Sequence, residues 1–359
     1  MLKNYYFWIG FSFSVVFIAV ILFLFGDVVE VFDALSNIKA PFLVLAILMY
    51  FISLWFRGER WKFLLNPIIG KPKRNLLAVV TVGYMANNLL PMRMGEIFRS
   101  FYLSMREKIS VVSCIGTILL ERLSDVLTLC FILFLLGIFG FLWGNAILID
   151  LFSNIQGGIK ILALAIAMPF VVLLALLIFV IHNIDIGEKI LLKTTFFLGK
   201  KYQKYIVNLY RTFSKGLLVV RNPGVFLKLL LASIPVWLAE IGVALLVAEG
   251  FGINDYFTSR VDMFIGIICF TAISNLAGIL PSTSGGWGPY DFFGAITLHG
   301  FGLDPSIAAS FALTVHVVLW LPPTIMGVII LWFDKTSISE LIKKSRKFRL
   351  QLKRYHTER

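Results

Sequence analysis

The sequence has 359 residues, of which 59% are hydrophobic and only 15% are charged, against about 25% charged in soluble domains. This composition and a mean hydropathy of +0.89 exclude an ordinary cytosolic protein. The net charge is +13. In a soluble protein that excess would suggest nucleic acid, but here the basic residues lie between apolar segments. They indicate membrane topology and contact with anionic lipid, and no nucleic-acid partner is expected.

Long runs without a charged residue recur along the chain. A membrane-spanning helix needs about 20 apolar residues, and one soluble core could not hide so many such runs. Backbone groups in lipid must be hydrogen-bonded within the protein, which favours helices. We therefore predict an all-α polytopic membrane protein. The runs are residues 7–25, 40–56, 75–92, 126–149, 263–290 and 305–333.

The N-terminus and the cysteines narrow the class further. Residues 1–25 contain one lysine and a 19-residue apolar core, and no small-residue cleavage site follows, so they predict a retained first span. Cys114, Cys130 and Cys269 all lie in apolar stretches. No disulfide framework, metal site or cofactor is expected from their spacing.

Basic residues are concentrated in three segments and nearly absent from three others. By the positive-inside rule, the segments rich in basic residues are cytoplasmic and the poor segments are external. Both chain ends are then expected on the cytoplasmic side of a cell membrane. The rich segments are 57–75, 183–222 and 334–359, with six, eight and nine of the 33 basic residues. The poor segments are 26–40, 144–158 and 250–262, which hold only Lys39 and Arg260.

This orientation conflicts with a full span at 75–92, because basic stretches lie on both sides of it. A re-entrant hairpin of 75–92 and 93–108, entering from the cytoplasm with its tip near Pro91, resolves the conflict. Residues 263–280 and 290–303 predict a second hairpin that enters from outside. We expect about six full spans plus two oppositely oriented hairpins, eight hydrophobic segments in all, in an inverted-repeat-like arrangement.

A single transmembrane domain is expected over residues 1–335. Its halves, about 40–182 and 224–335, are joined by the cytoplasmic basic segment 183–223. Residues 336–359 form a basic cytoplasmic tail that suits an anionic lipid surface. Each half contains Asn, Leu-Pro, Gly and an acid in the same order. This match indicates either an internal repeat or a chance similarity between two Pro/Gly-containing breaks in the apolar segments.

The first candidate site follows Pro91. Glu96 lies three residues from both Arg93 and Arg99, so all three share one helical face. Because arginine matches phosphate bidentately, the functional interpretation is a basic cradle whose glutamate positions the arginines. The alternative is an interfacial amphipathic helix whose charges face water.

The second candidate site is Glu121, Arg122 and Asp125, inside a long apolar stretch. The two acids lie four residues apart on one face, and Arg122 is within reach of Asp125. Intramembrane charges usually face a cavity or a partner. The alternative is a structural ion network that braces the first hairpin. We also expect Glu121 or Asp125 to pair with Arg93 or Arg99.

The third candidate site is the glycine segment with Gly285, Gly286 and Gly288, followed by Pro289 and Asp291. Glycines allow positive φ, and Pro289 can open a half-helix whose N-terminus favours an anionic group. Backbone N–H groups there would be donors to that group. Asp291 is then either a substrate or proton site or a simple helix-start acid.

Three further polar residues lie in apolar runs. Glu240 is in mid-span, where it is a candidate for proton coupling or a protonated carboxyl retained for packing. His299 and His316 are interpreted as satisfied structural histidines.

The three motifs, taken in order, resemble a known family. Residues 83–99, 121–125 and 281–291 are similar to signatures of the lysylphosphatidylglycerol synthase transmembrane family. This is the flippase-like domain of multiple peptide resistance factors, also called the UPF0104 membrane family. The resemblance covers roughly residues 5–335 and implies lipid translocation. The last signature usually ends in Glu, whereas this sequence has Asp291, and no soluble aminoacyl-transferase domain is expected.

The leading hypothesis is therefore a flippase for a lipid with an anionic, phosphate-bearing head group, either a phospholipid or a polyprenyl-phosphate-linked lipid. The alternative is a membrane-embedded transferase or an accessory subunit that acts on a lipid-linked substrate beside a separate lipid-modifying enzyme. No catalytic residue is assigned, because the sequence has no HExxH, Asp-rich or Ser/His/Asp grouping. The predicted head-group ligands are Arg93, Arg99 and Arg122, and the acids that position them are Glu96, Glu121, Asp125 and Asp291.

Overall fold

The computed structural model describes residues 38–70, 76–90, 94–107, 109–143, 183–195, 222–279 and 284–334, with single positions between 172 and 211. The predicted first span, Arg93 and the basic tail lie outside these residues. The described residues form helices and contain no strand. Five helices are long and apolar enough to cross a membrane, which confirms the predicted all-α membrane class.

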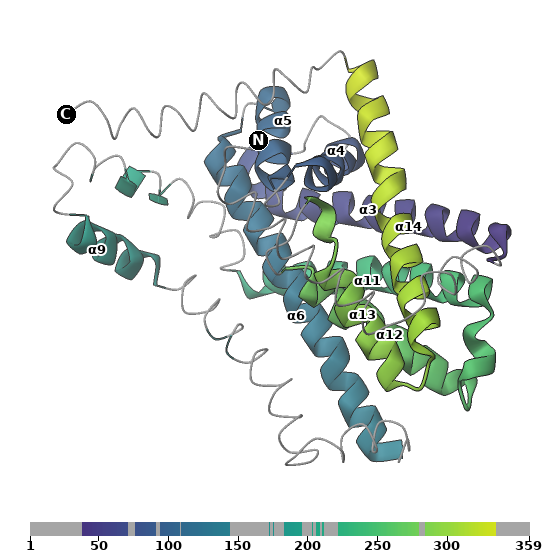
Figure 1. Cartoon of the computed structure of the whole chain (residues 1–359). Coiled ribbons are helices and arrows are strands. Elements are labelled where there is room, and N and C mark those ends of the chain that lie inside the picture. Colours follow the sequence, from purple (N-terminus) through teal and green to yellow (C-terminus); the bar gives the residue numbers. More distant parts are fainter. Residues whose placement is uncertain are drawn as a thin grey trace.

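The helices fall into two groups in chain order (Figure 1). The first group is α3 (Ala40–Ile69), α4 (Leu76–Leu89), α5 (Gly95–Glu107) and α6 (Val111–Trp143). The second is α11 (Pro223–Phe251), α12 (Arg260–Ala277), α13 (Pro289–Gly300) and α14 (Pro305–Phe333), with the short turns η3 (Ile253–Tyr256) and η4 (Ser284–Gly286). Helix α9 (Ile184–Thr194) lies between the groups in the sequence.

Both groups use the same order of parts: a long helix, two shorter helices separated by a break, and a second long helix. Within each group the same neighbours touch, so the contacts α3–α4, α4–α5, α5–α6 and α3–α6 have counterparts in α11–α12, α12–α13, α13–α14 and α11–α14. Across the groups, α4–α14 corresponds to α6–α12. This repetition supports the sequence match between the two breaks.

Helices α3 and α11 form the largest contact between the groups and run antiparallel. At one end the Lys39 N–H donates to the Gly250 carbonyl at 3.1 Å. At the other end an Arg60 Nη1 donates to Ser233 Oγ at 2.8 Å. The polar side chains of the candidate site lie along this contact.

Glycines bring the shorter helices together within each group. A Cβ on Gly95 would lie 2.3 Å from both the Gly83 carbonyl oxygen and the Asn87 backbone nitrogen, so α5 meets the backbone of α4 directly. In the second group, a Cβ on Gly294 would lie 2.5 Å from Phe270 and from Ser274. Both helix pairs therefore depend on a missing side chain.

Candidate functional site

Two arginines of α3 are completely enclosed by other helices. Arg57 is 2% exposed and Arg60 is 0% exposed. An Arg60 nitrogen lies 2.6 Å from Asp125 on α6, and an Arg57 nitrogen lies 3.3 Å from the other oxygen of the same carboxylate. The charge pattern of the sequence places both arginines among the cytoplasmic basic residues. In the structure they belong instead to a buried ion network.

The network continues through Glu121 on α6, which is 0% exposed. Its carboxylate lies 2.8 Å from an Arg99 nitrogen on α5 and 3.4 Å from an Arg60 nitrogen. The Arg99 guanidinium also lies over the Trp61 ring, 4.2 Å from its centroid. One of the expected pairings, Glu121 with Arg99, is thus present, and it joins α5 to α6.

Glu96 does not position Arg99, contrary to our expectation. Arg99 turns toward Glu121, and Glu96 instead lies 3.3 Å from Arg122 on α6. Arg122 also lies 3.5 Å from Asp125, as its spacing predicted. The Glu96 and Arg122 side chains are 31% and 26% exposed, so this pair forms the open edge of the network. The three-residue spacing places Glu96 and Arg99 on one face of α5, but the contacts with α6 determine which residue each of them pairs with.

Glu240 on α11 belongs to the same ion network, which therefore crosses the contact between the two helix groups. It accepts hydrogen bonds from Arg57 and from Ser53 Oγ, the latter at 3.4 Å. Glu240 therefore connects α11 to the buried arginines of α3.

The second group carries a separate acid–base pair. Asp291 in the first turn of α13 lies 2.8 Å from His316 Nδ1 on α14. Its other oxygen accepts the Gly288 N–H at 3.0 Å. Asp291 is therefore a helix-start acid, as one interpretation predicted, but it also holds a histidine. The Gly288 N–H, which we expected to face a ligand, is already used within the chain.

The glycine segment has the backbone that its sequence predicted. Gly285, Gly286 and Gly288 have φ of 85°, 88° and 98°, which L-residues rarely adopt. Pro289 begins α13, also as predicted. The Gly285 carbonyl lies 3.0 Å from His316 Nε2, so the histidine joins this segment to α14.

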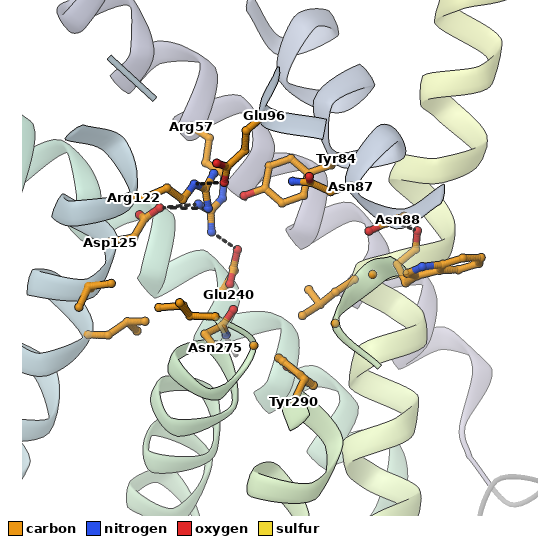
Figure 2. Close-up of a pocket in the computed structure, with 18 of the residues that line it drawn as sticks. Arg57, Tyr84, Asn87, Asn88, Glu96, Arg122, Asp125, Glu240, Asn275 and Tyr290 are labelled. Atoms are coloured by element: carbon orange, nitrogen blue, oxygen red, sulfur yellow. Dashed lines mark hydrogen bonds and ion pairs between the residues drawn. The ribbon is translucent and has the colours of Figure 1, made fainter. Parts of the chain in front are cut away.

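A cavity of about 260 Å³ lies between the two groups and is lined by both (Figure 2). Charged side chains from α3, α5, α6 and α11 form one part of its wall, and amides, aromatic rings and the glycine segment form the rest. The charged lining residues are Arg57, Glu96, Arg122, Asp125 and Glu240. The polar neutral ones include Tyr84, Asn87, Asn88, Asn275 and Tyr290.

The predicted site residues divide into two sets. Glu96, Arg122, Asp125, Gly285, Gly286 and Glu240 line the cavity. Arg99, Glu121, Gly288 and Asp291 lie behind it and hold the lining residues in place. Sequence reasoning missed Arg57, Tyr84, Trp237 and His316 as lining residues. The sequence contains one indication that Arg57 lies within the membrane region, because it directly follows a 17-residue run without charged residues.

Two donors in the cavity wall retain hydrogen-bonding capacity. Within the described residues, Arg57 Nε and Trp237 Nε1 are buried and have no hydrogen-bond acceptor. They are neighbours, because the Arg57 guanidinium lies 5.2 Å from the Trp237 ring centroid. Leaving a buried N–H donor without an acceptor costs free energy, and an anionic oxygen in the cavity would accept these hydrogen bonds. In the described part of the chain, no cluster of three metal-ligating side chains occurs.

These features define a polytopic helical membrane protein with a polar cavity between two similar helix groups. Residues 7–327 match the family model described as the lysylphosphatidylglycerol synthase TM region, and the chain belongs to this family.

Two of the relatives of this chain are named as membrane proteins and a third as a glycosyltransferase. It is 25% identical to a UPF0104 membrane protein of Methanocaldococcus jannaschii over 87% of this chain and 90% of the relative. It is 26% identical to a UPF0104 membrane protein of Methanothermobacter thermautotrophicus over 98% and 99%. It is 22% identical to the glycosyltransferase AglD of Haloferax volcanii over 82% of this chain but 49% of that protein. No solved structure matches the chain.

Proposed function

We propose that this protein is a lipid flippase that moves a phosphate-bearing head group through the cavity between its two helix groups. The observation that carries the proposal is the cavity itself. It is lined by both groups, and it contains ionised side chains in a region where apolar helices are long enough to cross a bilayer. Intramembrane charges that face a cavity are typical of a substrate pathway.

The head-group ligands that we propose are Arg57 and Arg122, of which only Arg122 was among those that the sequence suggested. Arg57 and Arg122 reach the cavity, whereas Arg99 lies behind it in its pair with Glu121. The unused donors of Arg57 and Trp237 are suited to a phosphate oxygen. Asn87, Asn88 and Asn275 supply amides for hydroxyl groups on the rest of the head. The acyl or prenyl chains would remain in the bilayer.

The proposed transport mechanism is alternating access by two inverted repeats. The α4–α5 and α12–α13 pairs would be the two re-entrant hairpins, and both chain ends would face the cytoplasm of a cell membrane. The repeated contacts of the two groups support this arrangement. Cysteines introduced at Asn275 and at Trp287 test it by labelling with a membrane-impermeant maleimide. Both should label from outside or from the cavity, and labelling of Trp287→Cys only from the cytoplasm would contradict the model.

The transport proposal is tested in proteoliposomes that contain fluorescent phosphatidylglycerol. The wild-type protein should expose the inner-leaflet label to an external quencher, and Trp237→Phe should slow exposure because it removes one unused donor. Phe333→Leu is a matched control, since Phe333 is 81% exposed and remote from the cavity. Equal rates in empty and protein-containing vesicles would refute the proposal for this lipid.

A membrane-embedded transferase or an accessory subunit beside a lipid-modifying enzyme is the second candidate. The similarity to a glycosyltransferase over about half of that protein's length is the observation that supports it. Purified protein incubated with lipid-linked sugar donors should produce no covalent change if the flippase proposal is correct. Mass spectrometry of the extracted lipids decides between the two functions.

A further inference from the structure

The His316 ring has a hydrogen-bond acceptor at each of its two nitrogens. Nδ1 lies 2.8 Å from an Asp291 oxygen, and Nε2 lies 3.0 Å from the Gly285 carbonyl oxygen. A neutral imidazole has one N–H and one lone pair, so it satisfies only one of these acceptors. A protonated imidazolium donates to both. The hydrogen-bond geometry therefore fits the cationic ring.

The surroundings of the ring also suit a cation. The Trp287 indole is stacked on it, with ring centroids 4.2 Å apart and planes inclined by 24°. Tyr290 lies against it at 4.7 Å. Aromatic faces attract cations. The charged group in contact with the ring is Asp291 of α13. Other titratable groups line the shared cavity: Tyr50 and Arg57 on α3, Tyr84 on α4, Glu96 on α5, Arg122 and Asp125 on α6, and Glu240 on α11.

Among the described residues around the cavity, the charges of the ion pairs balance when His316 is protonated. Four arginines lie opposite four carboxylates in the connected network, and His316 lies opposite a fifth carboxylate, Asp291. The arginines are Arg57, Arg60, Arg99 and Arg122, and their partners are Glu96, Glu121, Asp125 and Glu240. A neutral His316 would leave one uncompensated negative charge beside the space for an anionic head group.

We propose that His316 is a proton-binding site of the transport cycle and that a proton enters the cavity together with an anionic head group. The inference rests on the proposed flippase function. The proton passes from the aqueous phase through water in the cavity to Nε2, and it returns to the aqueous phase on release. Nδ1–H remains bonded to Asp291 in both states. Each of the two ligands, proton and anion, lowers the electrostatic cost of binding the other, so their affinities are linked.

The glycine segment is the part of the wall that responds to this proton. When Nε2 loses it, the Gly285 carbonyl faces a lone pair instead of a donor. Gly285 is tightly placed, because a Cβ there would lie 2.5 Å from Trp320 Nε1. The bond from His316 Nε2 to the Gly285 carbonyl oxygen is a second contact that holds this segment. Proton release thus loosens one wall of the cavity as the head group leaves.

Nitrogen NMR of ¹⁵N-histidine protein in nanodiscs tests the site without requiring transport. The His316 signals are assigned from a His316→Gln spectrum, and the signals of His299, which is exposed and does not line the cavity, are the internal reference in each membrane. At pH 7 the protonated fraction of His316, corrected by His299, should be higher in phosphatidylglycerol than in phosphatidylcholine. An equal corrected fraction in the two lipids, or a neutral ring throughout pH 5 to 9, would overturn the inference.

The transport assay separates this inference from the proposed function. Exposure of fluorescent phosphatidylglycerol by the wild type should fall about 5-fold or more from pH 6 to pH 8.5. His316→Lys should lose most of this dependence, while His299→Gln should retain it. Transport with no pH dependence, together with an unresponsive ring, would refute the proton site and leave the flippase intact. A lipid-responsive ring without transport at any pH would refute the flippase for this lipid and leave the proton site standing.

Discussion

The two helix groups hold equivalent acid–base pairs of different character. In the first group Glu96 at the start of α5 pairs with Arg122 on α6, and in the second Asp291 at the start of α13 pairs with His316 on α14. The arginine stays charged at every physiological pH, whereas histidine changes charge near neutrality. The first pair is also partly exposed and the second is buried. One group thus provides a fixed charge and the other provides a charge that can change.

The largest expected effect comes from removing the centre of the fixed network. Glu121→Gln would remove the carboxylate that faces Arg99 in a buried site, whereas Arg60 would keep its shorter contact with Asp125. We expect the free energy of unfolding to fall by about 3–5 kcal/mol, measured by denaturant unfolding in detergent micelles. Glu59→Gln is the control. Its pair with Lys62 is about 40% exposed, so its loss should cost at most about 1 kcal/mol. Similar losses for the two variants would contradict a structural network.

The glycine contacts provide a matched pair of variants, one in each group. In Gly95→Ala the new methyl meets backbone atoms at 2.3 Å, whereas in Gly294→Ala it meets the ends of Phe270 and Ser274 side chains at 2.5 Å. Side chains can move aside and the backbone of α4 cannot. We expect Gly95→Ala to cost about 2–3 kcal/mol of unfolding free energy and Gly294→Ala about 1 kcal/mol. The reverse order would show that the first helix pair is the more adaptable.

Asp291→Asn tests the acid of the second pair. It weakens the bonds to His316 and to the Gly288 N–H, and we expect a loss of about 1–2 kcal/mol in unfolding free energy. Transport should be nearly abolished, because His316 loses its counter-charge. Asp291→Glu should retain part of the activity. A fully active Asp291→Asn protein would remove Asp291 from the site.

Glu96→Gln is the corresponding variant in the first group and should have the smallest effect on stability. Its partner Arg122 keeps Asp125 and Glu121 within 3.5 Å and 3.2 Å, and the pair is partly exposed. We expect a loss of about 0–1 kcal/mol. Transport should keep the wild-type pH dependence, measured in the same vesicles. A loss of that dependence would place the switchable charge in the first group as well.

Local features of the fold and site were readable from the sequence. The break before Pro289, the positive φ at Gly285 and Gly286, and the pair between Arg99 and Glu121 all follow from short-range rules or from neighbouring motifs. The membrane class followed from apolar runs, which need no knowledge of tertiary contacts.

The residues that were missed depend on contacts between distant segments. Arg57 meets Asp125 and Glu240, which lie 68 and 183 positions away along the chain. A charge count places such an arginine at the membrane surface, because it contains no information about a buried partner. His316 was interpreted as structural for the same reason, since its acceptors lie on Asp291 and Gly285 of other segments.

The ionic contact between α3 and α11 has a consequence for how the two groups can move. Separating α3 from α11 would take Glu240 away from Arg57 in a low-dielectric interior and would break the bond from Arg60 to Ser233. In the proposed transport cycle, the two long helices would therefore act as a pivot that stays closed while other contacts open. Helix α4 meets α14 through Met85 against Gly327 and through Asn88, which donates to the Trp320 carbonyl and to Thr324 Oγ1, both at 2.8 Å. Rotation about the α3–α11 axis would open this seam of uncharged side chains, and the lipid tails would then enter and leave there.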